Sequence, residues 1–343
     1  MSSMPADEMH HLVPKGNPNL HGSEEVAYIS TEERALLLEI LRDTFGARTK
    51  ISCLQVMKYL RDYIVAVVRL AQPAISVTVK LAGHDPAISS SFERTAVLLR
   101  TIAARTAVSV PQVLSLDVSV DKWPWRYTIQ SYLPGQEWAT VQQQMSSQEQ
   151  RDAGEQMGRA IAELHSIKYP YFGEVEGEGV GRPSMLYIQA LMARTERRIA
   201  HPPQAKLFKD LLEERSHLFV DIEQATLCHE DLHGHNILFM RSREKGWQLS
   251  GIVDFDSAWA GCYESDLARL ALWEGVAGIA FWEAYGEKPD LSAAYRERRL
   301  VHQLMWCLEY RSRSPQHVAD TRRVCSALGI SNAERLLSTI DAL

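Results

Sequence analysis

The stretch that decides the fold is HEDLHGHN, residues 229–236, followed by IVDF at residues 252–255. Apolar and β-branched residues between them predict two strands, Asn236–Met240 and Trp247–Phe255. The charged residues 241–246 would form the turn of a hairpin. Such a hairpin would return Asp254 to the neighbourhood of Asn236.

The residue types in this stretch suit phosphoryl transfer, which asks a protein mainly for positioning and for charge to offset phosphate oxygens. The spacing H-x-D-L-x-x-x-N is that of a kinase catalytic loop. Asp231 would accept or orient the attacking hydroxyl, and His233 is the second catalytic candidate. Asn236 and Asp254 would give hard oxygen ligands to Mg²⁺ that bridges the phosphates of ATP or GTP.

A zinc site is the alternative interpretation of the same stretch. Its ligands would be Cys228, His229, His233 and His235. These residues are crowded within one short segment rather than arranged in separated pairs, which disfavours structural zinc.

Together these segments resemble the aminoglycoside phosphotransferase family, whose signature is H-G-D-L-H-x-x-N, a hairpin, I-D and a D-L-A helix start. Residues 251–254 (GIVD) and 266–269 (DLAR) match the later parts, and the likeness runs from about Val56 to Trp273. The resemblance implies that His229 braces the catalytic loop and that Asp266 caps the following helix. The chain departs from the family at Glu230, where glycine is usual.

A lysine and a glutamate upstream are candidates for holding the nucleotide. Residues 77–81 (VTVKL) resemble the kinase strand whose lysine, here Lys80, contacts the α- and β-phosphates. Glu93 lies on the predicted helix Ser90–Ala104 and is the expected ion-pair partner of Lys80.

Residues 127–135 (YTIQSYLPG) resemble the segment that connects the two lobes in this family. On that alignment Gln130 lies behind the base, the carbonyl of Ser131 accepts from the purine amino group, and the amide of Leu133 donates to the ring. Because backbone groups would make these contacts, the side chains do not distinguish ATP from GTP.

Residues 58–64 (KYLRDYI) stand where a glycine-rich phosphate loop is expected. Backbone amides surround phosphate best when side chains are absent. This departure keeps a non-catalytic, nucleotide-binding relative as an alternative.

Only nine residues, 257–265, separate the D-F-D triplet from D-L-A, which leaves no room for the activation segment of a protein kinase. The predicted acceptor is therefore a small hydroxylated molecule in a helical pocket. Candidate substrate residues are Trp259, Tyr263, Glu264, Trp273 and Glu274. Aromatic residues at helical spacing also pack into cores. We expect an antibiotic-type substrate, aminoglycoside-like or macrolide-like, or another natural product. The alternative is a metabolic substrate such as choline, homoserine or a sugar, which would use the same chemistry.

The whole chain is expected to have an α+β, two-lobed, protein-kinase-like fold. Residues 1–29 are predicted to be a flexible tail. A small antiparallel sheet with one helix would form the N-lobe, residues 30–133, and the mainly helical C-lobe would follow over residues 134–343.

Composition excludes several other classes of protein. A net charge of −6 argues against nucleic acid as a partner. No apolar run reaches the roughly 20 residues of a membrane helix. Five scattered cysteines fit a reducing cytoplasm. The oligomeric state does not follow from the sequence.

Overall fold

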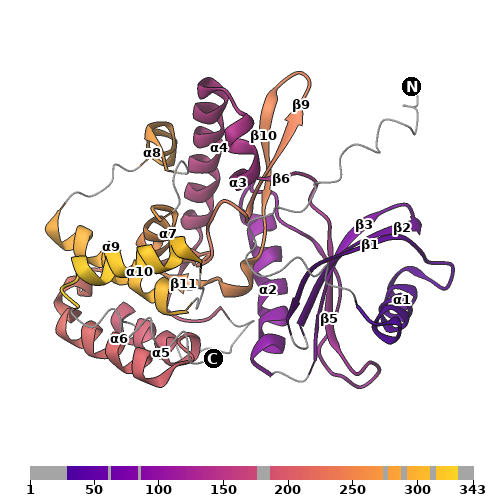
Figure 1. Ribbon diagram of the computed structural model, residues 1–343, viewed down its shortest axis with the longest axis horizontal. Coiled ribbons are helices and arrows are strands. Elements are labelled where there is room, and N and C mark those ends of the chain that lie inside the picture. The colour runs from indigo at the N-terminus through magenta and orange to yellow at the C-terminus, as the bar shows by residue number, and fades with distance from the viewer. Residues whose placement is uncertain are drawn as a thin grey trace.

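The computed structural model has two lobes, a β-sheet lobe and a mainly helical lobe (Figure 1). It describes residues 29–60, 63–83, 86–175, 186–272, 277–286, 292–309 and 314–330. The expected two-lobed α+β fold is confirmed. The predicted tail lies outside the described residues, apart from Ile29. No helix in the described ranges is long and apolar enough to cross a membrane.

The sheet of the first lobe has five antiparallel strands in the order β1-β2-β3-β5-β4. Their bounds are β1 Lys50–Leu60, β2 Tyr63–Gln72, β3 Ser76–Ala82, β4 Val113–Asp117 and β5 Arg126–Ser131. Alternate residues of β2 are buried on one face, as the period of two along a strand requires. Lys80 on β3 pairs with Thr128 on β5, so the lysine lies in the middle of the sheet.

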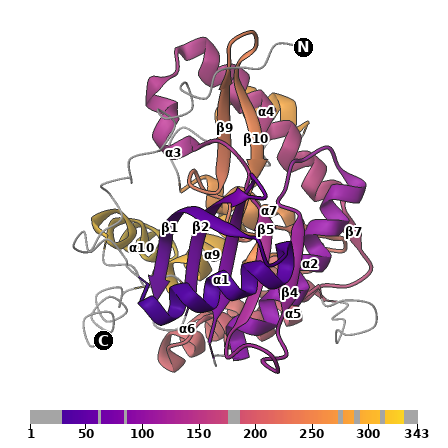
Figure 2. The same ribbon diagram turned by 90° about the vertical axis from the view of Figure 1, so that its right-hand side faces the viewer.

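Helix α1, Thr31–Phe45, covers the face of this sheet that is turned away from the helical lobe (Figure 2). Ser30 and Glu33 form a capping box at its start, which satisfies backbone N–H groups that the first turn leaves unpaired. Leu37, Ile40 and Leu41 are buried against the sheet.

Helix α2, Pro86–Arg105, lies between the sheet and the helical lobe (Figure 1). Its residues Leu98, Leu99 and Ile102 are buried in the core of the helical lobe rather than in the core beneath the sheet. The helix therefore packs against both lobes, and its side chains contact residues of each.

The second lobe consists of helices around two small sheets. Its helices are α3 Trp138–Val141, α4 Ser147–Ser166, α5 Tyr187–Arg198, α6 Pro202–Glu214, α7 Tyr263–Leu270, α8 Ile279–Tyr285, α9 Ala293–Glu309 and α10 Pro315–Ala327. One sheet has the order β10-β9-β6, with strands Gly246–Ile252, Ile237–Ser242 and Gln136–Glu137. The other has the order β11-β8-β7, with strands Trp259–Gly261, Ala225–Cys228 and Lys168–Tyr169.

The predicted hairpin is confirmed as the antiparallel pair β9–β10. The pairing of β8 with β11 was not predicted. Both strands are short and buried at every residue, so the alternation that marks a half-buried strand is missing. These two strands nevertheless hold the segments before and after the hairpin side by side, and thereby position the site.

Candidate active site

The catalytic candidates meet in the loop between β8 and β9. The side-chain nitrogen of Asn236, Nδ2, donates to the backbone carbonyl of Asp231 at 2.9 Å and lies 3.4 Å from its Oδ2 atom. Nε2 of His233 lies 3.2 Å from the same nitrogen and 3.5 Å from Oδ1 of Asp231. The structure thus brings Asp231, His233 and Asn236 together.

Arg269 of α7 adds a positive charge to this group, with its NH1 atom 3.6 Å from Oδ1 of Asp231. Burial alone would raise the pKa of Asp231, but His233 and Arg269 favour the charged form and hold the pKa well below its usual value. Asp231 is therefore ionised at neutral pH. The sequence did not predict this role of Arg269, although the residue directly follows the D-L-A motif.

His229 connects the catalytic loop to the segment that carries Asp254, the candidate metal ligand. Its Nε2 donates to the carbonyl of Val253 at 2.9 Å, and its Nδ1 accepts the amide hydrogen of Asp231 at 3.2 Å. Burial lowers the pKa of His229, so the neutral ring keeps this tautomer. These contacts support the predicted bracing role.

The prediction that Asp266 caps the following helix is wrong. Helix α7 begins at Tyr263 with Cys262 as its N-cap, which places Asp266 inside the first turn. Its carboxylate instead accepts the backbone N–H groups of His229 and Glu230, both at 2.7 Å. It also lies 3.1 Å from Nε2 of His165. Asp266 therefore supports the catalytic loop across space rather than its own helix.

Asp254 and Asn236 lie on neighbouring backbone segments, because the amide of Val253 donates to the carbonyl of Asn236 at 3.0 Å. Asp254 has a left-handed backbone with φ of 68°, and its side chain is 44% exposed. The Asn236 amide nitrogen is turned toward Asp231, which leaves its oxygen available as a ligand. A carboxylate and an amide oxygen are hard donors, and this set fits Mg²⁺.

Lys80 reaches this segment from β3, with Nζ 2.8 Å from Asp254 and 2.6 Å from Asp256. Burial opposes its charge, but the two carboxylates raise the pKa of Lys80 well above its usual value. The predicted Lys80–Glu93 ion pair is not formed: Glu93 is exposed, and Asp254 and Asp256 pair with the lysine instead. Sequence reasoning assigned no role to Asp256, because spacing alone does not tell which carboxylate reaches a distant lysine.

The predicted base-binding residues lie at and beyond the end of β5. Gln130 is buried and pairs with Thr78 of β3, while Ser131 is the last residue of the strand. Leu133 follows, and its side chain lies against Gly251 of β10. A Cβ atom added to this glycine would lie 2.7 Å from Cδ1 of the leucine. The leucine side chain could rotate away, but the backbone carbonyl oxygen of Ser109 would lie 2.6 Å from the same Cβ, and this close backbone approach requires glycine.

Glu230, which stands where the family usually has glycine, keeps the left-handed backbone with φ of 62°. Its side chain accepts a hydrogen bond from Nε1 of Trp259 at 2.9 Å and another from the hydroxyl of Ser265. NH2 of Arg194 lies 4.0 Å from its Oε2 atom. These contacts compensate for a backbone conformation that costs a non-glycine residue about 1–2 kcal/mol.

The three predicted substrate residues that the structure describes do not form one surface. Trp259 is fully buried beneath Arg194, and Glu264 is buried with both carboxylate oxygens bound by Arg298, at 2.7 and 2.8 Å. Tyr263 packs against the helical core. Trp273 and Glu274 lie outside the described residues.

A pocket lies beside the catalytic loop. Residues that were not among the predicted site residues line it, and they include Glu230, Arg269, Trp306 and Glu309. Arg269 both lines this pocket and lies against Asp231, so the pocket adjoins the carboxylate of Asp231.

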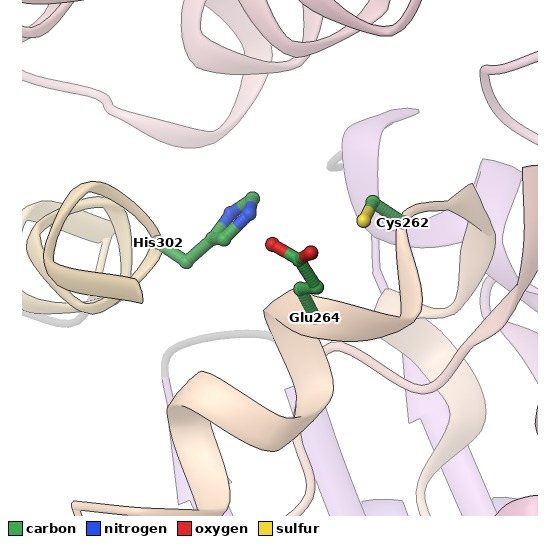
Figure 3. Close-up of side chains that lie close together, drawn as sticks. All are labelled: Cys262, Glu264 and His302. Carbon is green, nitrogen blue, oxygen red and sulfur yellow. The ribbon is translucent and has the colours of Figure 1, made fainter. Parts of the chain in front are cut away.

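Cys262 at the start of α7, Glu264 of α7 and His302 of α9 come together between the two helices (Figure 3), with ligand atoms within 4.8 Å of one another. Within the described part of the chain this is the one grouping of its kind, and it does not include the Cys228–His235 residues considered for zinc. Arg298 already neutralises Glu264 through two hydrogen bonds. A metal ion would have to displace that guanidinium, so we interpret the cluster as packing around an ion pair.

Solved structures of aminoglycoside phosphotransferases share the fold of this chain. A thermostable mutant of APH(4)-Ia, in ternary complex with ADP and hygromycin B, matches with a TM-score of 0.59 and 15% identity, covering 88% of this chain and 98% of that one. APH(2")-IIIa with GDP and kanamycin matches with a TM-score of 0.56 and 16% identity, covering 90% and 99%.

The fold and the site define a kinase-like phosphotransferase that acts on a hydroxyl group. The profile of the phosphotransferase enzyme family (APH) matches residues 33–301. The chain belongs to this family.

Proposed function

We propose that the chain transfers the γ-phosphate of magnesium-bound ATP or GTP to a hydroxyl of an antibiotic-type or other natural product, aminoglycoside-like or macrolide-like. The observation that carries the proposal is the meeting of Lys80, from β3 of the first lobe, with Asp254, which lies beside the loop that holds Asp231 and Asn236. Phosphoryl transfer needs this set: an acidic group for the hydroxyl, metal ligands and a cation for the phosphates.

Asp231 would orient the acceptor hydroxyl and take its proton as the new bond to phosphorus forms. Because its pKa is low, orientation contributes more than early proton removal. Lys80 would contact phosphate oxygens of the donor. Asn236 and Asp254 would hold magnesium, which offsets the negative charge of the phosphates when it is bound.

The acceptor would approach Asp231 beside the small pocket that Arg269, Glu230 and Trp306 line, which by itself has room for about one water molecule. Proteins of the same fold bind hygromycin B, kanamycin and gentamicin in their solved complexes. These three compounds carry many hydroxyl groups, which supports a hydroxylated acceptor here. The five cysteines are free, which fits the proposed cytoplasmic location.

The test is a phosphorylation screen with ATP and GTP, with and without magnesium, across aminoglycosides, macrolides, amino alcohols and sugars. The Asp231→Asn variant serves as the matched control for background hydrolysis. Magnesium-dependent product from an aminoglycoside or macrolide would support the proposal. Product only from choline, homoserine or a sugar would replace it by a metabolic kinase, and nucleotide binding without any product would indicate a non-catalytic relative.

A further inference from the structure

The two carboxylates on Lys80 have different surroundings. The side chain of Asp254 is 44% exposed and that of Asp256 is 21% exposed. Asp254 is also the proposed magnesium ligand, so a bound metal would compete with Lys80 for the negative charge of this carboxylate. Asp256 would then be the main partner of Lys80.

Asp256 is fixed by helix α2. The hydroxyl of Thr95 donates to its Oδ1 atom at 2.9 Å, while Oδ2 accepts from Lys80 at 2.6 Å and from the hydroxyl of Tyr63 at 3.4 Å. NH2 of Arg94 donates to its backbone carbonyl at 2.8 Å, and the same arginine pairs with Glu174 at 2.9 Å. Both the backbone and the carboxylate of Asp256 are therefore tied to α2.

Helix geometry explains why Glu93 does not take this place. Residues two apart on an α-helix are rotated by about 200° around its axis. Because Thr95 faces Asp256, Glu93 points to the opposite side, where it is exposed. Even a fully extended side chain of Glu93 would therefore point away from Lys80.

We propose that Asp256 is the positioning residue that holds Lys80 toward the nucleotide phosphates, in the role expected of Glu93, and that Thr95 connects this pair to α2. The inference rests on the proposed kinase function. It differs from a metal-ligand role, because Asp256 acts through the lysine and needs no magnesium to do so.

A double-mutant cycle tests the proposal in the full-length protein. Nucleotide kcat/KM, and the Kd of a fluorescent ATP analogue with magnesium or with EDTA, would be measured for Lys80→Met, Asp256→Asn and the double variant. We expect Asp256→Asn to lower kcat/KM about 10-fold when Lys80 is present and less than about 2-fold in the Lys80→Met protein, because coupled residues are not additive. The loss of affinity should persist in EDTA.

Two variants of α2 make the test specific to Thr95. Thr95→Val should lower kcat/KM in the same direction but by less, and Thr95→Ser should restore it, since serine keeps the hydroxyl. Glu93→Gln should stay within about 2-fold of the unaltered protein.

Three results would overturn the inference. An equal loss from Asp256→Asn with and without Lys80 would show that it does not act through the lysine. An affinity loss that disappears in EDTA would make Asp256 a metal ligand. A loss in Glu93→Gln as large as that in Asp256→Asn would return the role to the glutamate. If the unaltered protein binds no nucleotide, the proposed function fails, and the inference fails with it.

Discussion

The guanidinium of Arg269 lies 3.6 Å from the carboxylate of Asp231, although the two residues belong to a helix and a loop separated by a hairpin. Together with His233, this arginine keeps Asp231 charged despite its burial. The site therefore contains an ionised carboxylate at the position where we propose that the acceptor hydroxyl binds.

Replacing Asp231 by asparagine should lower kcat by at least about 100-fold, because the amide cannot accept the hydroxyl proton. Nucleotide affinity should change little, since the carboxylate faces the acceptor. Steady-state kinetics and nucleotide titration would measure the two effects, with the exposed Asp210→Asn as a matched control. Loss of nucleotide binding, with turnover preserved at saturation, would contradict this role.

Replacing Asp254 by asparagine should weaken magnesium-dependent nucleotide binding by about 10-fold or more, because a charged ligand of the metal is lost. Asparagine tolerates the left-handed backbone at this position, so the fold should be kept. The measurement is nucleotide affinity at increasing magnesium concentration. A magnesium dependence identical to that of the unaltered protein would count against the assignment.

Replacing Glu230 by glycine should lower the free energy of unfolding by about 1–3 kcal/mol, although it relieves the left-handed backbone. The loss of its carboxylate removes hydrogen-bond acceptors from Trp259 and Ser265 and a negative charge beside the buried Arg194. Urea denaturation would measure the change, and Glu230→Gln would separate the charge from the backbone effect. A glycine variant as stable as the original would mean that these contacts contribute nothing net.

Acid should destabilise the protein as the pH falls below about 6.5, the ordinary pKa of histidine. Burial lowers the pKa of His302 in the folded state, so the unfolded chain binds more protons in this range and unfolding is favoured. Each such histidine adds a slope of at most about 1.4 kcal/mol per pH unit. Unfolding free energies at pH 7.5 and 5.5 should differ less in His302→Gln than in the unaltered protein. An unchanged difference would exclude His302 as a source.

The residue types and their spacing along the chain were enough to predict the catalytic loop, the hairpin and the two-lobed fold. Asp231, His233 and Asn236 lie within one short loop, so their meeting follows from covalent connection. The hairpin β9–β10 then returns the chain to Asn236, because antiparallel pairing brings its two ends together.

Partners far apart in the chain were decided by the tertiary structure. Lys80 pairs with Asp254 and Asp256 rather than with Glu93, because the rotation of α2 around its axis sets which side chains face the lysine. The start of α7 at Tyr263 likewise turns Asp266 from an expected helix cap into a support of the catalytic loop. Residue types and spacing determined which chemical groups this protein carries, whereas helix orientation and packing determined which of them touch.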